Sequence, residues 1–319
     1  MAAEAGRDVL RENGTATEAM VAAAAVIAVV YPHMNAIGGD GFWLISRPGE
    51  APIGVDACGP AARLATRDYY GERGLAAIPT RGPQAALTVP GTVGGWQTAL
   101  SHATNGGGGG RLPLSRLLEP AAALARDGVP ITAGQALVTR EKLNELHDLP
   151  GFAETFLDAY GRPLECGARL RQPALADTLE QLSRVGLDDF YRGDVARSIA
   201  ADLDTLGSPL RLDDLLEYRP LTVEPLSLRV GKARLYNMPP PTQGLASLLI
   251  LGIHQRVPVP NMGPFGHIHA LVESTKKAFR VRDRHVADPR WMTVNPQDFL
   301  CGQWLETAAS EIDMTRAAP

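Results

Sequence analysis

The feature that most constrains the fold of this chain is a glycine-rich turn between an alanine-rich segment and two apolar ones. Residues 16–31 are rich in Ala and Val, which is typical of a helix buried on several sides. Gly38, Gly39, Asp40 and Gly41 then lead directly into an aromatic segment. Glycine is used where the main chain takes unusual angles or where another group approaches it closely. We therefore expect a turn at a strand end whose backbone forms one wall of a pocket.

Apolar runs joined by turn residues predict two hairpins. Pro48, Gly49 and Glu50 separate the strands of the first, which we expect to be buried, and Gly231 separates those of the second. The expected strands are residues 42–47 with 53–57, and residues 221–230 with 232–236. A further strand is predicted over residues 87–89, turning through Pro90 and Gly91 into a helix.

Periodic apolar residues between start and stop signals predict the helices. Thr15 and Glu18 have the spacing of a capping box, in which each side chain binds a free backbone amide of the other residue. The predicted helices cover residues 2–12, 16–31, 114–127, 135–147, 173–185, 193–206, 245–254, 267–284 and 300–313, with a short one from residue 66. Helices together with hairpins indicate an α+β protein, and we expect a single domain over residues 1–319.

Composition excludes several classes of partner. Hydrophobic residues make up 45% and charged residues 21% of the chain, as in a globular protein with a sizeable core. The formal net charge is -4 and no long run of like charge is present, so we expect neither nucleic acid nor a membrane surface as a partner. Residues 21–30 are too few for a membrane span, which needs roughly 20 residues. A small-molecule substrate fits better.

The three cysteines, Cys58, Cys166 and Cys301, are widely spaced and form no CxxC pair. This pattern predicts neither a disulfide framework nor a metal site, and we expect no metal and no cofactor. Cys58 has no neighbouring His or Lys in the sequence that would lower its pKa, so we interpret it as a small buried hydrophobic residue.

Several short motifs, taken together and in order, resemble the gamma-glutamyltranspeptidase family of N-terminal-nucleophile hydrolases. The resemblance is to the large subunit and covers nearly the whole chain. The motifs are Asn13-Gly14, residues 32–42 (PHMNAIGGDGF), residues 65–68 (ATRD), residues 89–95 (VPGTVGG), residues 120–128, residues 189–193 (DFYRG), residues 238–244 (MPPPTQG) and residues 287–289 (ADP).

The resemblance implies the large-subunit half of a four-layer αββα sandwich and a precursor that cuts itself before a threonine. The new N-terminal threonine becomes the nucleophile and its free amine the base. The resemblance places that cut after this chain, so we expect no catalytic residue here and a small subunit from the same precursor as the partner. A dimer of these heterodimers is one assembly left open. Residues 315–319 are then expected to be a loose tail.

The segment from Asp56 to Gly59 bears on the substrate. In transpeptidases the matching segment reads Asp-x-Arg-Glu, and its arginine binds the α-carboxylate of a gamma-glutamyl group. Here Cys58 stands at the arginine position and Gly59 at the glutamate position. A thiol cannot replace a bidentate guanidinium. Arg63 follows a few residues later as a candidate substitute.

These observations favour hydrolysis of a small carboxylate-bearing amide such as oxamate, a reaction of purine catabolism, over turnover of glutathione. Alternatives are a gamma-glutamyl hydrolase or transferase, a cephalosporin-type acylase, and a non-catalytic binding subunit. We expect a cytoplasmic protein, or a periplasmic one if the natural chain starts upstream of Met1. The candidate pocket residues are Asn35, Gly38, Gly39, Asp40, Cys58, Gly59, Arg63, Pro240, Thr242 and Gln243.

Overall fold

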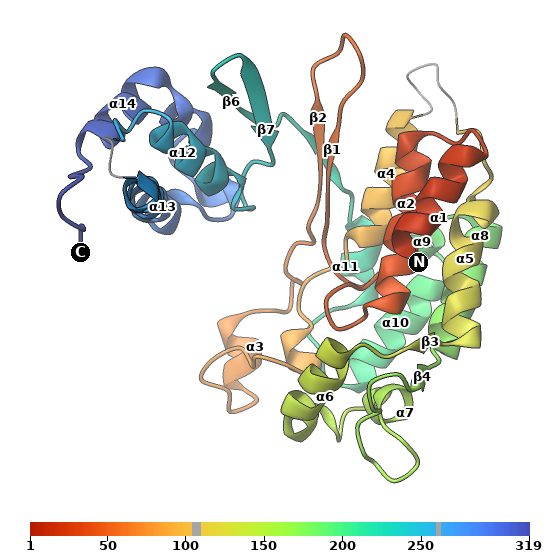
Figure 1. Ribbon diagram of the computed structural model, residues 1–319. Helices are drawn as coiled ribbons and strands as arrows, with labels where there is room; N and C mark the ends of the chain where they lie inside the picture. Colours follow the sequence, from red (N-terminus) through yellow and green to blue (C-terminus); the bar gives the residue numbers. More distant parts are fainter. Residues whose placement is uncertain (104–109, 260–262) are drawn as a thin grey trace. The chain divides into compact units, whose positions relative to one another are not determined.

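The computed structural model describes residues 1–103, 110–259 and 263–319, and over these residues the chain divides into two compact units. Unit 1 comprises residues 1–41 and 57–221, and unit 2 comprises residues 42–56 and 222–319 (Figure 1). The chain passes from unit 1 to unit 2 and back through the first hairpin. One domain over the whole chain stays a prediction, because compact units are not by themselves separate domains.

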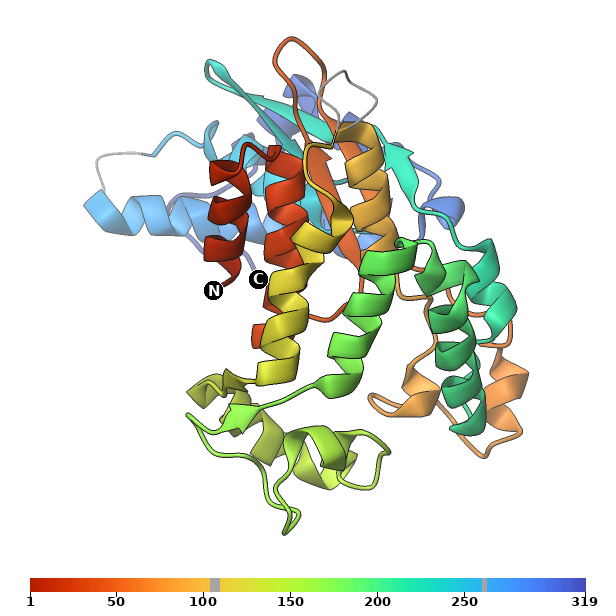
Figure 2. The same cartoon turned by 90° about the vertical axis from the view of Figure 1, so that its right-hand side faces the viewer.

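Unit 1 is built mainly of helices. α2 packs against α1 and α5, and α5 packs against α8, so that these helices lie side by side (Figures 1 and 2). The helices are α1 (Ala2–Arg11), α2 (Ala16–Val30), α3 (Arg67–Gly71), α4 (Thr92–Ala103), α5 (Leu114–Asp127), α6 (Ala133–Leu146), α7 (Phe152–Phe156), α8 (Pro173–Val185), α9 (Asp189–Arg192), α10 (Asp194–Thr205) and α11 (Leu212–Glu217), with a 3-10 turn η1 (Pro83–Ala85). Short strands β3 (Val129–Pro130) and β4 (Arg169–Leu170) pair antiparallel.

The predicted capping box at the start of α2 is present. Glu18 N donates to Thr15 Oγ1 over 3.2 Å, and Thr15 N donates to Glu18 Oε2 over 2.6 Å. The other carboxylate oxygen of Glu18 accepts the backbone amides of Arg111 and Leu112. Burial disfavours the charged carboxylate, but these hydrogen bonds outweigh it and hold the pKa of Glu18 below its ordinary value. One glutamate therefore fixes the start of the central helix and a distant loop.

Unit 2 combines strands with helices. β1 (Gly41–Ile45), β2 (Ile53–Ala57) and β5 (Leu221–Val223) form a sheet in that order, whose residues lie almost wholly in this unit, and β6 (Leu226–Val230) pairs antiparallel with β7 (Ala233–Asn237). The helices are α12 (Gly244–His254), α13 (Gly263–His285) and α14 (Gly302–Ser310), with 3-10 turns η3 (Pro289–Trp291) and η4 (Pro296–Leu300). Leu228, Leu249 and Leu305 are buried in a core that joins the hairpin to α12 and α14.

Both predicted hairpins form, with two corrections. The run over residues 221–230 is two strands, because Pro225 has no amide hydrogen to continue the ladder. The first hairpin is not fully buried, since Phe42 is 41% and Leu44 is 45% exposed on β1, at the edge of its sheet. The strand predicted over residues 87–89 is also wrong, because Thr88 makes only an isolated bridge to Ala61.

The expected loose tail is instead hydrogen-bonded to α13. Ala318 N donates to Glu273 Oε2 over 3.2 Å, Lys276 Nζ donates to Ala318 O over 2.6 Å, and Arg280 Nη2 donates to Pro319 O over 2.7 Å. Basic residues of α13 thus bind this chain's own backbone. Among the residues described, no helix has both the length and the apolarity needed to cross a membrane.

Candidate functional site

The predicted glycine turn packs onto the start of α4. The backbone amides of Gly91 and Thr92 donate to the Gly39 carbonyl oxygen over 2.8 and 2.9 Å. Thr92 Oγ1 donates to the Asp40 carbonyl oxygen over 2.9 Å. The turn and the Pro-Gly junction, far apart in the sequence, therefore form one surface.

The end of β2 completes this surface. Gly59 N donates to Asp40 Oδ1 over 3.3 Å. A Cβ atom at Gly59 would lie 1.6 Å from Val89 O, and one at Gly91 would lie 1.8 Å from Ala57 O. These backbones touch because both positions are glycine. We call residues 38–41, 57–59 and 89–92 the glycine wall.

Tyr191 of α9 is hydrogen-bonded to the backbone on both sides of the Gly91 turn in the glycine wall. Its hydroxyl donates to Pro90 O and accepts Gly94 N, each over 2.8 Å. The side chain is 1% exposed, and burial raises its pKa, so the hydroxyl stays protonated and can donate. The sequence offered a signal for this residue in the motif over residues 189–193, but its role was not predicted.

The structure brings four of the predicted pocket residues together in the glycine wall with Cys58: Gly38, Gly39, Asp40 and Gly59. Asn35 lies just before it, with its backbone amide bonded to Tyr31 O over 3.1 Å. The interpretation of Cys58 as a buried hydrophobic residue is wrong, because the residue is only half-buried. It forms no disulfide.

Arg63 is held by two carboxylates of α11. Its Nη2 lies 2.5 Å from Glu217 Oε1, its Nε lies 3.8 Å from Asp214 Oδ1, and its backbone amide donates to the same Asp214 oxygen over 3.1 Å. Asp214 is buried. The guanidinium therefore already has anionic partners within the chain.

The remaining candidates lie in unit 2, at the start of α12. Thr242 Oγ1 is 3.0 Å from both Met238 O and Pro239 O and accepts Gly244 N over 3.1 Å. Gln243 Oε1 accepts from Arg282 Nη1 over 3.1 Å. These contacts shape the turn that follows Pro240. A common pocket for these residues and the glycine wall stays a prediction.

One cavity of unit 1, about 650 Å³ in volume, includes Gly38 in its lining. Phe190, Leu203 and other apolar side chains line it together with three carboxylates, Asp177, Asp194 and Asp202. Carboxylates repel an anionic substrate. We therefore do not assign this cavity to a carboxylate-bearing substrate.

The glycine wall offers backbone groups, the exposed Asp40 carboxylate and the Cys58 thiol. In the part of the chain described, these groups can shape and orient a substrate. Within that part, no cluster of three or more His, Cys, Asp or Glu side chains is suited to a metal ion.

Comparison with known proteins gives a consistent result. The gamma-glutamyltranspeptidase family model matches residues 2–319. The oxamate amidohydrolase proenzyme of Klebsiella pneumoniae is 49% identical over 319 residues, which is 100% of this chain and 60% of that protein. A glutathione hydrolase-like proenzyme of Bacillus subtilis, YwrD, is 35% identical over 98% of this chain and 58% of its own length. The chain thus spans about three fifths of these curated relatives.

Solved structures of related enzymes have the same fold as this chain. The crystal structure of Helicobacter pylori gamma-glutamyltranspeptidase matches with a TM-score of 0.90 at 26% identity, covering 100% of this chain and 91% of that one. Cephalosporin acylase from Bacillus halodurans matches with a TM-score of 0.87 at 30% identity, covering 98% of this chain and 58% of that one. The expected α+β fold class of this family is confirmed. On the family match and these likenesses, the chain belongs to the gamma-glutamyltranspeptidase family.

Proposed function

We propose that this chain is the large subunit of a self-cleaving amidohydrolase that acts on a small carboxylate-bearing amide such as oxamate. The proposal rests on one observation: the residues at the position of the transpeptidase carboxylate clamp cannot form that clamp here. Cys58 is a half-buried thiol, Gly59 has no room for a side chain, and Arg63 is held by Asp214 and Glu217. A gamma-glutamyl group would find no arginine free to bind it here.

Oxamate does not need a clamp at that distance, because its carboxylate is bonded directly to the scissile carbonyl carbon. The 49% identity to an oxamate amidohydrolase proenzyme supports this substrate class. A larger gamma-glutamyl substrate gains much of its binding energy from the distant α-carboxylate, so losing that contact penalises it far more.

The proposed reaction passes through an acyl-enzyme. The hydroxyl of an N-terminal threonine on the small subunit attacks the amide carbonyl while its own amine takes the hydroxyl proton. The tetrahedral intermediate collapses, the C–N bond breaks, and ammonia leaves with that proton. Water then hydrolyses the oxalyl ester, which releases oxalate and restores the threonine. The part of this chain would be to shape the pocket with the glycine wall.

The exposed edge of the first sheet supports a partner chain. β1 is the end strand of its sheet, and Phe42 and Leu44 are exposed on it. An edge strand with exposed apolar side chains is usually covered by another strand, helix or chain. The small subunit of the same precursor is the partner that we propose.

The test is to express the full precursor, verify cleavage by mass spectrometry, and compare two assays. Ammonia release from oxamate is expected to exceed p-nitroaniline release from a gamma-glutamyl anilide by at least about a hundredfold in kcat/KM, as expected when a charged clamp is missing. A single uncut polypeptide, or no ammonia from oxamate, would overturn the proposal.

The second candidate is a gamma-glutamyl hydrolase or transferase, favoured by the likeness to the glutathione hydrolase-like protein of Bacillus subtilis. This function requires an arginine that binds the α-carboxylate of the substrate. That arginine is either Arg63, after it leaves Asp214 and Glu217, or an arginine of the partner subunit. If Arg63 is the clamp, Arg63→Gln abolishes release of p-nitroaniline, whereas the control Arg67→Gln, an exposed arginine of α3, does not. Equal anilide activity in both variants would exclude Arg63 as the clamp.

A further inference from the structure

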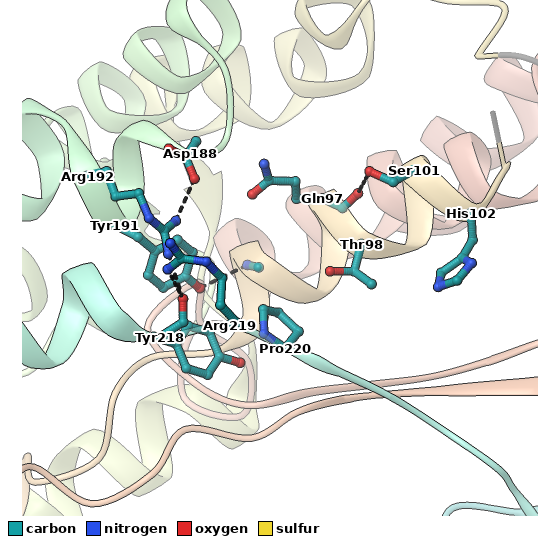
Figure 3. A pocket seen from close by; sticks show the side chains of 11 residues that line it. Gln97, Thr98, Ser101, His102, Asp188, Tyr191, Arg192, Tyr218, Arg219 and Pro220 are labelled. Carbon is teal, nitrogen blue, oxygen red and sulfur yellow. Dashed lines mark hydrogen bonds and ion pairs between the residues drawn. The ribbon is translucent and has the colours of Figure 1, made fainter. Parts of the chain in front are cut away.

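A cavity of about 460 Å³ in unit 1 is lined on one side by α4 (Figure 3). None of the predicted pocket residues lines it. Its walls come from three places in the sequence: α4, α9 and the segment that follows α11. The side chains that the argument uses are Gln97 and Thr98 of α4, Tyr191 and Arg192 of α9, and Arg219 and Pro220.

Two positive charges meet at one wall of this cavity. Arg192 Nη2 and Arg219 Nη1 both donate to the Tyr218 carbonyl oxygen, over 2.6 and 2.7 Å. Sharing one acceptor brings the two guanidinium groups side by side, as Figure 3 shows. Asp188 pairs with Arg192. Arg219 has no ion-pair partner among residues 1–103, 110–259 and 263–319, so the wall keeps a net positive charge.

Part of the hydrogen-bonding capacity of these arginines is unused. Arg192 Nε is buried and finds no acceptor in the described part of the chain. Within the described ranges, the Arg219 guanidinium makes its hydrogen bonds through Nη1, to Leu216 O and Tyr218 O. A guanidinium has five N–H donors in a planar fork that matches a carboxylate. A buried donor without an acceptor is unfavourable unless a ligand supplies one.

The other walls combine polar side chains of α4, His102 among them, with apolar surface. Gln97 and Thr98 project from α4 across from the guanidinium groups, and Pro220 and the ring of Tyr218 provide apolar surface (Figure 3). The cavity is also much larger than an inorganic anion requires. The cavity therefore suits a ligand that has an anionic group attached to a carbon skeleton.

We propose that this cavity binds a small organic carboxylate, with its carboxylate on Arg192 and Arg219 and its carbon skeleton against Tyr218 and Pro220. The site is distinct from the glycine wall but is joined to it by one side chain. Tyr191 lines the cavity, and its hydroxyl bonds Pro90 O and Gly94 N. Occupancy therefore stiffens the start of α4, on which the glycine turn rests.

The test is isothermal titration of the full processed protein with sodium glutarate at constant ionic strength. Arg219→Gln is expected to weaken the binding at this site at least about tenfold, the loss of hydrogen bonds to a charged group. The matched control is Arg197→Gln, an exposed arginine of α10 outside the cavity, which removes the same charge and leaves the titration unchanged. Equal binding in both variants would overturn the proposal, whatever substrate the enzyme hydrolyses.

A second variant covers the case in which Arg219→Gln fails to fold. Gln97→Glu is nearly isosteric and places a tethered carboxylate in the cavity. It is expected to compete with glutarate, weakening binding at least about tenfold, and to raise the thermal midpoint of unfolding by pairing with the guanidinium groups. Unchanged glutarate binding in this variant, or equal affinity of the wild-type site for inorganic phosphate, would contradict an organic carboxylate site.

Discussion

At the scale of single residues, the backbone around Gly59 leaves no room for a side chain. The missing glutamate leaves no vacant space behind, because Val89 O occupies the place where a Cβ atom would lie. The backbone at the end of β2 lies against the Val89–Gly91 segment. Restoring the clamp by Cys58→Arg with Gly59→Glu would thus require this backbone to move, which is why we treat the difference as a change of substrate class.

Gly59→Ala is expected to destabilise the protein by about 2 kcal/mol, the typical cost of forcing a methyl group into a packed site. The Cβ atom would otherwise overlap Val89 O at 1.6 Å. Gly38→Ala is the control, since no atom lies within 4 Å of a Cβ there and the change should stay within about 0.5 kcal/mol. Chemical denaturation measures both. Equal stabilities would show that the Gly59 backbone is loosely packed.

Tyr191→Phe is expected to cost about 2 kcal/mol, because it leaves Gly94 N and Pro90 O without their shared partner in a buried site. Tyr160→Phe serves as the control, because Tyr160 is 83% exposed. Thermal unfolding of the two variants compares them. A Tyr191→Phe protein as stable as the control would mean that the hydroxyl does not hold the glycine wall.

At the scale of elements, the sequence predicted most helices to within a few residues, because their apolar period and caps are local signals. Thr15 with Glu18 caps α2 as expected, and the short helix predicted from residue 66 is α3, with Thr66 as its N-cap. The strands were predicted less well. Whether a strand forms depends on a partner that is distant in the sequence, and residues 87–89 find only an isolated bridge. Pro225, which cannot donate a ladder hydrogen bond, separates β5 from β6.

The contact between α12 and α13 is expected to weaken in acid. His254 and His267 have ring centroids 4.8 Å apart, and His254 Nδ1 is buried with no hydrogen-bond partner in the described residues. Burial, and secondly the charge of His267, lower the pKa of His254 from 6.5. A lowered pKa means that the unfolded chain binds the proton first, so stability is full above about pH 6.5 and falls as the pH drops below it.

His254→Leu should therefore reduce the loss of unfolding free energy between pH 7.5 and 5.5. The loss is reduced and not abolished, because burial also lowers the pKa of His33. His147→Gln is the control, since this ring is exposed on α6's C-terminal side. Denaturation curves at several pH values measure the slope. An identical pH dependence in wild type and His254→Leu would contradict the assignment.

At the scale of the whole molecule, the family motifs name individual segments but do not say how the fold brings them together. Asp40, Gly59 and Arg63 were grouped as pocket candidates, but the sequence offered no sign that Asp40 would accept Gly59 N or that Arg63 would be bound by α11, because these pairings depend on the tertiary fold. Tyr191 was missed for the same reason. The family resemblance implied a loose tail over residues 315–319, yet the backbone of Ala318 is bound by polar side chains of α13.

This attachment leads to a prediction about the precursor, which rests on the proposed self-cleavage. Glu273, 3% exposed, accepts Ala318 N, and Lys276 bridges Glu273 and Ala318 O, so α13 binds both backbone groups of one residue. The rate of self-cleavage depends on how precisely the peptide bond is positioned, and hydrogen bonds to the preceding residues contribute to that positioning. Lys276→Met in the full precursor should therefore slow cleavage roughly fivefold, the equivalent of one hydrogen bond.

The adjacent lysine provides the control. Lys277 lies on the same helix but pairs with Glu311 of the segment after α14, whereas the hydrogen bonds of Ala318 are made with Lys276 and Glu273. Lys277→Met removes the same charge and should cleave at the wild-type rate. The fraction of uncut precursor over time, measured by mass spectrometry of both variants, separates the two cases. If Lys276→Met and Lys277→Met are cut equally fast, the hydrogen bonds from α13 stabilise the tail without positioning the peptide that is cut.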